Sequence, residues 1–295
     1  MTYKSLKTRI KDITRKYAPL IYPFVYKASL RFSNSKIEKS RIEKYSRFVR
    51  PGFYPFELGK IKFDMKLDPA NGGVDMDIFA DKYYESKILE LVGSLLKKED
   101  TFIDIGANIG QHSMYASYFC KHVYSFEPVK KLFNQFNESI SKNVILNIST
   151  YNYALGNEKK RMPIYSNGVS MAASSINTVK NKKYIQDIQI LRFDDVYEKM
   201  NIGKAELIKI DVEGYELEVL LGAKEYINKY KPKILLEFSP YFYRRIDATI
   251  SDKIISFLVD SKYKVYDLGE YNDKRIPIFK LKDISNTDQV NLLCE

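Results

Sequence analysis

The stretch TFIDIGANIG at residues 101–110 constrains the fold of this chain more than any other segment. A β-branched and aromatic run ends at an acid, Asp104, and passes directly into a turn bracketed by Gly106 and Gly110. A helix-like pattern begins at Gln111, so the segment predicts a strand, a tight turn and a helix. The glycines allow the backbone to approach a bound molecule, and the free amides of the helix favour a carboxylate or another anion.

The acid at the end of this strand limits what the turn can bind. Asp104 would repel a phosphate, and the glycine spacing differs from the G-x-G-x-x-G pattern of dinucleotide-binding turns. A ligand with amine, carboxylate and ribose hydroxyl groups but no phosphate fits better, and S-adenosylmethionine is the obvious example. The alternative is a tight strand-to-helix turn that binds no ligand.

Two later segments end predicted strands with residues suited to the same ligand. Glu127 in VYSFEP ends the second strand, where an acid can accept hydrogen bonds from both ribose hydroxyls, and Pro128 then stops the strand. Ala154 and Leu155 end the third strand and could form a slot for a flat purine. The alternatives are an acid that interacts with a helix dipole at Glu127, and ordinary core at Ala154 and Leu155.

The segment LIKIDVEGYELEVLLGA is a buried strand that delivers Asp211 and Glu213 to its end. A further strand, ending in ILLEFSP, brings Glu237 to the same edge. Ligands of doubly wound sheets bind at the carboxyl ends of strands where the strand order reverses. We therefore predict that Asp211 faces the ligand held by Gly106. The alternative for Asp211 and Glu213 is one acid that caps a helix and one that faces solvent, and the alternative for Glu237 is helix capping.

Strand-like and helix-like segments alternate from Thr101 onward, which is typical of a mostly parallel sheet covered by helices on both faces. An irregular insert at 156–185, rich in Asn and Ser, interrupts this alternation. Predicted helices cover residues 81–97, 129–141, 215–229 and 250–261, and predicted strands cover residues 60–67, 101–104, 122–127, 149–155, 188–193, 207–211, 233–238, 263–268 and 277–282.

The excess charge of the chain lies in residues 1–50, which hold fourteen Lys or Arg and three acids and so carry the whole formal charge of +11. A Pro- and Gly-rich joint at 50–59 places a boundary near Pro51, between a basic, helical N-terminal arm (1–50) and a catalytic body (51–295). The arm is either packed on the body with a solvated basic face or a surface for anionic lipid, and nucleic acid is the weakest partner because the body adds no basic patch.

The remaining composition narrows the class of protein. No apolar run approaches the ~20 residues of a membrane span, and no signal peptide is evident. Two cysteines, Cys120 and Cys294, and two histidines, His112 and His122, show neither disulfide nor metal-ligand spacing. We therefore expect a reducing, cytoplasmic compartment and no dedicated metal site, with a divalent ion held by Asp211 and another acid as the alternative.

Taken together, the motifs resemble the FkbM family of S-adenosylmethionine-dependent methyltransferases. DIGANIG, FEP, the ALG turn, Asp194 in ILRFDDVY, KIDVEGYELEVLLGA and KPKILLEF occur in family order between about Tyr83 and Phe238. The resemblance implies an α/β, Rossmann-like class I methyltransferase fold, in which a seven-stranded, mostly parallel sheet has an antiparallel last strand. It also implies O-methylation, typically of a sugar or natural-product hydroxyl.

The resemblance also implies roles for the motif residues. The methionine part of the cofactor would contact Asp104, Gly106, Asn108 and Gly110. The ribose would contact Glu127 beside Pro128, and the adenine would contact Ala154 and Leu155. The arm at 1–50 falls outside the shared pattern.

A sulfonium is already a reactive methyl donor, so the protein mainly has to place an acceptor oxygen and remove its proton. We predict Asp211 as the base or as the group that orients the base, with His112 as the alternate base. Glu213 is predicted to position the acceptor, and Glu237 to be a further acceptor contact. The expected acceptor is a glycan hydroxyl, and a lipid-linked cell-envelope precursor at the inner membrane face is one candidate for it. The alternatives are an RNA methyltransferase that uses the arm, or a non-catalytic interaction module.

Overall fold

The computed structural model describes residues 50–68, 71, 73–166, 174–175, 183–268, 276–277 and 289–295. The arm predicted at 1–50 lies outside these residues except for Arg50, so its helical character and its partners stay predictions. Contacts divide the chain into two compact units, residues 1–84 with 169–172 and residues 85–168 with 173–295. The boundary predicted near Pro51 likewise stays a prediction.

The described part of the smaller unit is a hairpin followed by a helix, comprising β1 (Gly52–Leu58), β2 (Ile61–Leu67) and α3 (Gly73–Asp81). The joint predicted at 50–59 is wrong, because most of it is β1. Pro55 obscured the strand pattern, although proline is tolerated in a strand that has a free edge. The cross-strand pair Phe56 and Phe63 holds the hairpin, with ring centroids 4.2 Å apart.

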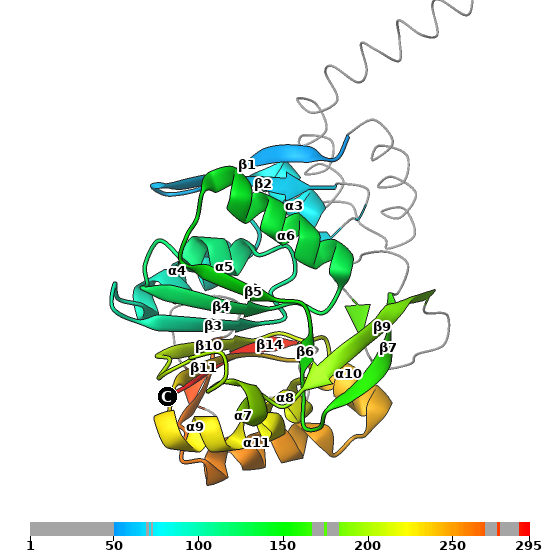
Figure 1. The fold of residues 1–295 in the computed structure, drawn as a ribbon. Helices are drawn as coiled ribbons and strands as arrows, with labels where there is room; N and C mark the ends of the chain where they lie inside the picture. Colours follow the sequence, from blue (N-terminus) through cyan, green and yellow to red (C-terminus); the bar gives the residue numbers. More distant parts are fainter. Residues whose placement is uncertain are drawn as a thin grey trace, which may run out of the picture. The chain divides into compact units, whose positions relative to one another are not determined.

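The main sheet of the larger unit has the strand order β13-β12-β14-β11-β10-β3-β4-β5. Figure 1 shows its part from β14 to β5. Its members are β3 (Thr101–Ile105), β4 (His122–Phe126), β5 (Ile148–Tyr151), β10 (Leu207–Ile210), β11 (Lys233–Phe238), β12 (Val265–Asp267), β13 (Ile276–Pro277) and β14 (Val290–Cys294). The strands β3, β4, β5, β10 and β11 are parallel, and β14 runs antiparallel between β11 and β12. The predicted seven-stranded, mostly parallel sheet is confirmed, with two-residue β13 added at its edge.

The chain runs outward from the middle of this sheet in both directions. From β3 it continues to β4 and β5 on one side, and from β10 to β11 on the other. The strand order therefore reverses between β3 and β10, which is where ligands bind in doubly wound sheets. The resemblance implied an antiparallel last strand, but its residues, those of β14, were not predicted. The strand predicted at 277–282 overlaps β13 only at Pro277, while 278–282 lie outside the described residues.

Alternating side chains of the strands bury both faces of the sheet. Phe102, Leu207 and Leu235 share one apolar cluster with α4, and the next residues along the same strands share another with α8, α9 and α11. The helices of this unit are α4 (Ser86–Leu95), α5 (Gln111–Ala116), α6 (Lys130–Asn143), α7 (Phe193–Val196), α8 (Glu216–Gly222), α9 (Lys224–Tyr230), α10 (Pro240–Ile246) and α11 (Ile250–Asp260). No helix in the described ranges is long and apolar enough to cross a membrane.

The single helix predicted at 215–229 is in fact two helices, α8 and α9, separated at Ala223. Asp194 from α7 accepts hydrogen bonds from the backbone amides of Glu225 and Tyr226, at 3.0 and 2.9 Å. These amides lie in the first turn of α9, where a helix has no partners of its own for them. Asp194 therefore has a structural role, the capping of α9.

A second, smaller sheet contains β6 (Ala154–Leu155), β7 (Lys160–Ser166), β8 (Ser174–Ser175) and β9 (Lys183–Leu191), in the order β6-β9-β7-β8. The prediction that residues 156–185 are irregular is therefore wrong where they form β7, which pairs antiparallel with β9. The strand predicted at 149–155 is split, since β5 joins the main sheet and β6 pairs with β9. The second sheet could not be predicted because residues 152–153 are turn-like and the insert contains many polar side chains.

Candidate active site

The carboxyl ends of β4, β3 and β10 meet at one edge of the main sheet, which we call the carboxyl edge. The amides of Gly106 and Ala107 donate to the carbonyl of Phe126 at 2.9 and 3.0 Å, and the amide of Asp211 donates to the carbonyl of Ile105 at 3.0 Å. Two segments a hundred residues apart are thereby joined. The prediction that the loops after β3 and β10 meet is confirmed.

The two glycines of the first loop are required by contacts within the protein. Gly106 has a φ of +88°, and a Cβ there would lie 1.8 Å from the backbone oxygen of Asp211. Gly110 has a φ of +83°, and its Cβ would lie 1.9 Å from the ring of Phe136 on α6. Each glycine thus lets another segment approach the loop, and contact of this loop with a ligand stays a prediction.

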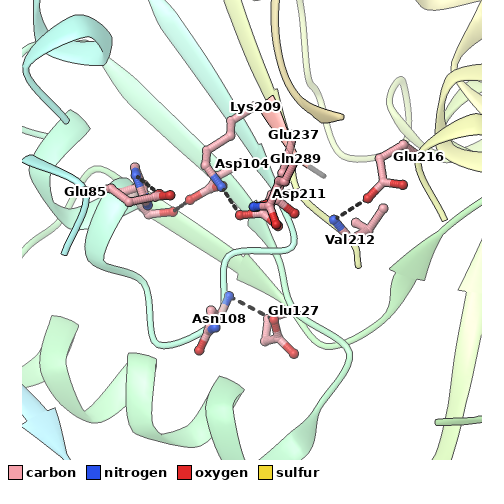
Figure 2. A network of polar contacts seen from close by, with 12 residues as sticks. Glu85, Asp104, Asn108, Glu127, Lys209, Asp211, Val212, Glu216, Glu237 and Gln289 are labelled. Carbon is pink, nitrogen blue, oxygen red and sulfur yellow. Dashed lines mark hydrogen bonds and ion pairs between the residues drawn. The ribbon is translucent and has the colours of Figure 1, made fainter. Parts of the chain in front are cut away.

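Glu127 connects this loop to the start of α6. The residue is 5% exposed, and its two carboxylate oxygens accept hydrogen bonds from the amides of Asn108 and Val129, at 2.8 and 2.7 Å. Figure 2 shows the bond from Asn108. Burial raises the pKa of Glu127 to about 7 in spite of these hydrogen bonds. Each carboxylate oxygen has a second lone pair, so Glu127 can still accept hydroxyl groups. Asn108 itself has a φ of 54°, which asparagine tolerates.

Hydrogen bonds and core packing also fix the residues near Glu127. The side-chain amide of Asn152 donates to the carbonyls of Glu127 and Pro128, at 2.9 and 3.0 Å. Leu155 is buried in the main core with Phe126, whereas Ala154 is half-buried. Of the two residues predicted to line a purine slot, Leu155 thus packs in the core.

A buried cation lies among acids at the centre of the carboxyl edge. Lys209 is 4% exposed, and its Nζ lies 2.7 Å from Oδ2 of Asp211. Asp104 is fully buried, and its Oδ2 accepts a hydrogen bond from Ser113 at 2.5 Å. Burial raises the pKa of Asp104, although the charge of Lys209 opposes this. Oδ1 of Asp104 is buried and has no hydrogen-bond partner among the described residues.

Asp211 is more accessible than Asp104, with 27% of its side chain exposed. Burial alone would raise its pKa, but the charge of Lys209 and a hydrogen bond from Lys209 outweigh burial and lower the pKa. The side chain of Glu237 also acts to lower the pKa of Asp211. Asp211 is therefore an ionised carboxylate near neutral pH, as a proton acceptor must be.

His112 lies in the first turn of α5 and is buried. Burial and the nearby charge of Lys209 lower its pKa to about 3, so the imidazole is neutral. Its Nε2 lies 3.7 Å from Oε2 of Glu85 and makes no hydrogen bond within the described part of the chain. His112 thus lies near Lys209, as Asp211 does. Its role as the alternate base stays a prediction.

The loop after Asp211 is held by an acid that was not predicted. Glu216 is fully buried, and its Oε1 accepts hydrogen bonds from the amides of Gly214 and Val212, at 3.0 and 3.3 Å. Glu213 adopts a φ of 56°, and its predicted role in positioning an acceptor stays a prediction. Lys209 was missed too, although a lysine inside the apolar strand LIKI is itself a signal that a buried partner exists.

The strand order, the glycine loop after β3, the acid after β4 and the antiparallel strand β14 together define a Rossmann-like methyltransferase fold of class I. Residues 104–266, more than half of the chain, match the model of the Methyltransferase FkbM domain. The chain belongs to this family.

Two curated relatives are similar to part of the chain. The hexuronic acid methyltransferase AglP of Haloferax volcanii is 27% identical over 143 residues, which cover 47% of this chain and 56% of AglP. Methyltransferase 1 of Beauveria bassiana is 25% identical over 171 residues, which cover 50% of this chain and 66% of that protein. The chain therefore spans between about half and two thirds of the length of these relatives.

Among solved structures, the chain is similar to the methyltransferase FkbM from Methylobacillus flagellatus. The sequence identity is 15%, and the match covers 75% of this chain and 52% of that chain with a TM-score of 0.44.

Proposed function

We propose that this protein transfers a methyl group from S-adenosylmethionine to a hydroxyl group of a sugar or glycan. One observation carries the proposal: Asp104, Glu127 and Asp211 come together at the ends of three adjacent parallel strands, where the strand order reverses. Membership of the FkbM family supports methyl transfer. The name of the relative AglP, a hexuronic acid methyltransferase, supports a sugar as the acceptor.

The residues at the carboxyl edge fit the cofactor. Oδ1 of Asp104 is a buried acceptor that finds no partner in the described part of the protein, and the amine of the methionine part can supply one. Glu127 keeps lone pairs for ribose hydroxyls. The methionine part would be held by Asp104, Gly106, Asn108 and Gly110, the ribose by Glu127 beside Pro128, and the adenine by Ala154 and Leu155.

When bound, the cofactor supplies a methyl group attached to a positively charged sulfur, which needs no further activation. The side chains then have to orient the acceptor and remove one proton from it. Asp211 accepts that proton, and Lys209 keeps Asp211 ionised before the transfer. Glu213, in the same loop, orients the acceptor, and His112 is the alternate base.

Methyl transfer to sugars tests this function. Incubation of the full chain with methyl-labelled S-adenosylmethionine and a panel of hexuronic acids, neutral hexoses and cell-envelope glycans is expected to yield a labelled methyl ether. Mass spectrometry and NMR would locate the label on a sugar oxygen. Label that appears on RNA instead, or on no acceptor although the cofactor binds, would contradict the proposal and favour one of the two alternative functions.

A further inference from the structure

Asp211 is clustered with Lys209 and Glu237 at the carboxyl edge (Figure 2). The ammonium group of Lys209 lies 2.7 Å from Oδ2 of Asp211 and donates a hydrogen bond to it. The strands β10 and β11 are parallel neighbours, and Ile210 pairs with Leu236. Asp211 and Glu237 are the next residues along the two strands, so this register places the two carboxyl groups side by side.

The last strand of the sheet supplies a partner for Glu237. Gln289, directly before β14, donates a hydrogen bond from its side-chain Nε2 to Oε1 of Glu237. Since Oε1 accepts this bond, Oε2 is the oxygen left to carry a proton. Gln289 lies outside residues 104–266, so this contact is not part of the region matched by the family model.

The charges around the pair favour one retained proton. Burial raises the pKa of Glu237 well above its usual value, and the negative charge of Asp211 raises it further. Two adjacent carboxylates cannot both ionise without a large electrostatic cost. Several titratable groups face the pair: Lys209 from β10, Asp104 from β3, His112 from α5, Glu127 after β4, Glu213 from the loop after β10, Glu216 from α8 and Tyr243 from α10. Lys209 is the one cation among them.

We propose that Asp211 and Glu237 share a single proton that stays on Glu237, so that Glu237 orients the ionised Asp211 and Asp211 alone deprotonates the acceptor. This inference rests on the proposed function. In the transfer step the acceptor O–H bond breaks and its proton binds to Asp211. The electron pair left on the acceptor oxygen forms the new bond to the methyl carbon, and the electrons of the broken carbon–sulfur bond remain on sulfur. Glu237 is then a positioning residue and makes no contact with the acceptor.

The shared proton can be measured without donor or acceptor. The infrared spectrum of the free protein near neutral pH is expected to contain a protonated carboxyl band that is weaker by one group in Glu237→Gln. Other buried carboxyl groups contribute to both spectra and cancel in the difference. Glu198→Gln is the control, since 74% of the Glu198 side chain is exposed. An unchanged carboxyl band, with the loss of a carboxylate band instead, would overturn the shared proton.

Kinetics then separate a positioning role from an acceptor contact. In Glu237→Gln the amide can still donate to Asp211 and accept from Gln289, so kcat is expected to stay within about 3-fold of the natural chain with KM unchanged. Glu237→Ala lacks the donor, and kcat should fall about 10-fold, the value of one hydrogen bond to a charged group.

The pH profile adds a readout that a purely structural residue would not change. The kcat of the natural chain should decline at alkaline pH as Glu237 loses its proton, and this decline should be absent in Glu237→Gln. A rise in KM for the acceptor with kcat unchanged in Glu237→Gln would overturn the inference and make Glu237 an acceptor contact. If the natural chain transfers no methyl group at all, the proposed function fails, and the infrared difference alone decides whether the proton is shared.

Discussion

Replacement of Asp211 by asparagine is expected to lower kcat for methyl transfer roughly 10²- to 10⁴-fold, which is the usual contribution of a positioned base. The amide has nearly the same shape as the carboxylate and can still accept a hydrogen bond from Lys209, which lies 2.7 Å from Oδ2 of Asp211. It cannot take up the proton of the acceptor. The initial rate at saturating acceptor measures the loss.

Affinity for S-adenosylmethionine should change little in Asp211→Asn, because the residues assigned to the cofactor are otherwise intact. Calorimetric titration of the variant with S-adenosylmethionine checks this. Asp195→Asn is a matched control, since Asp195 is 53% exposed and pairs only at 3.5 Å with Arg192. Full turnover in Asp211→Asn with unchanged cofactor binding would remove Asp211 from the role of base, and His112 would then take its place.

Replacement of Lys209 by methionine is expected to cost about 3–5 kcal/mol of the free energy of unfolding. Methionine fits an apolar strand, but it leaves Asp104 and Asp211 without the cation that both of them face. Denaturant unfolding measures the loss. A second effect follows from the same contact. Since Lys209 lowers the pKa of Asp211, the acid limb of the activity profile should move to higher pH in Lys209→Met.

Lys204→Met is the control for this stability effect. Lys204 forms an ion pair with Glu206 at 3.3 Å, but 60% of its side chain is exposed. Solvent-exposed pairs contribute at most about 1 kcal/mol. Equal losses of stability in Lys209→Met and Lys204→Met would contradict this prediction. They would show that burial of the charged group at the carboxyl edge does not contribute to the free energy of unfolding.

The central part of the fold could be predicted because its strands are short apolar runs that end at turns. The segments 101–105 and 207–210 are such runs, and each leads through glycine into a helix. Since the carboxyl ends of parallel strands share one edge, the proximity of Asp104, Glu127 and Asp211 followed from the strand pattern alone.

Other elements lacked a local signal. β14 is a five-residue run near the end of the chain, and its position between β11 and β12 depends on pairing with distant residues. The roles of Gly106 and Gly110 depend in the same way on Asp211 and Phe136, which approach from other segments. Glu216 could be taken for an ordinary acid in the first turn of a helix, and only the structure shows that it holds the loop after Asp211.

A crystal structure of the full chain with S-adenosylhomocysteine bound tests the central claim most directly. We expect the ribose hydroxyls within hydrogen-bond distance of Glu127 and the amino-acid part along residues 104–110. The sulfur should face the carboxylate of Asp211 with room for a methyl group and an acceptor oxygen between them. A ligand bound away from the loop at Gly106, or a sulfur turned away from Asp211, would contradict the account.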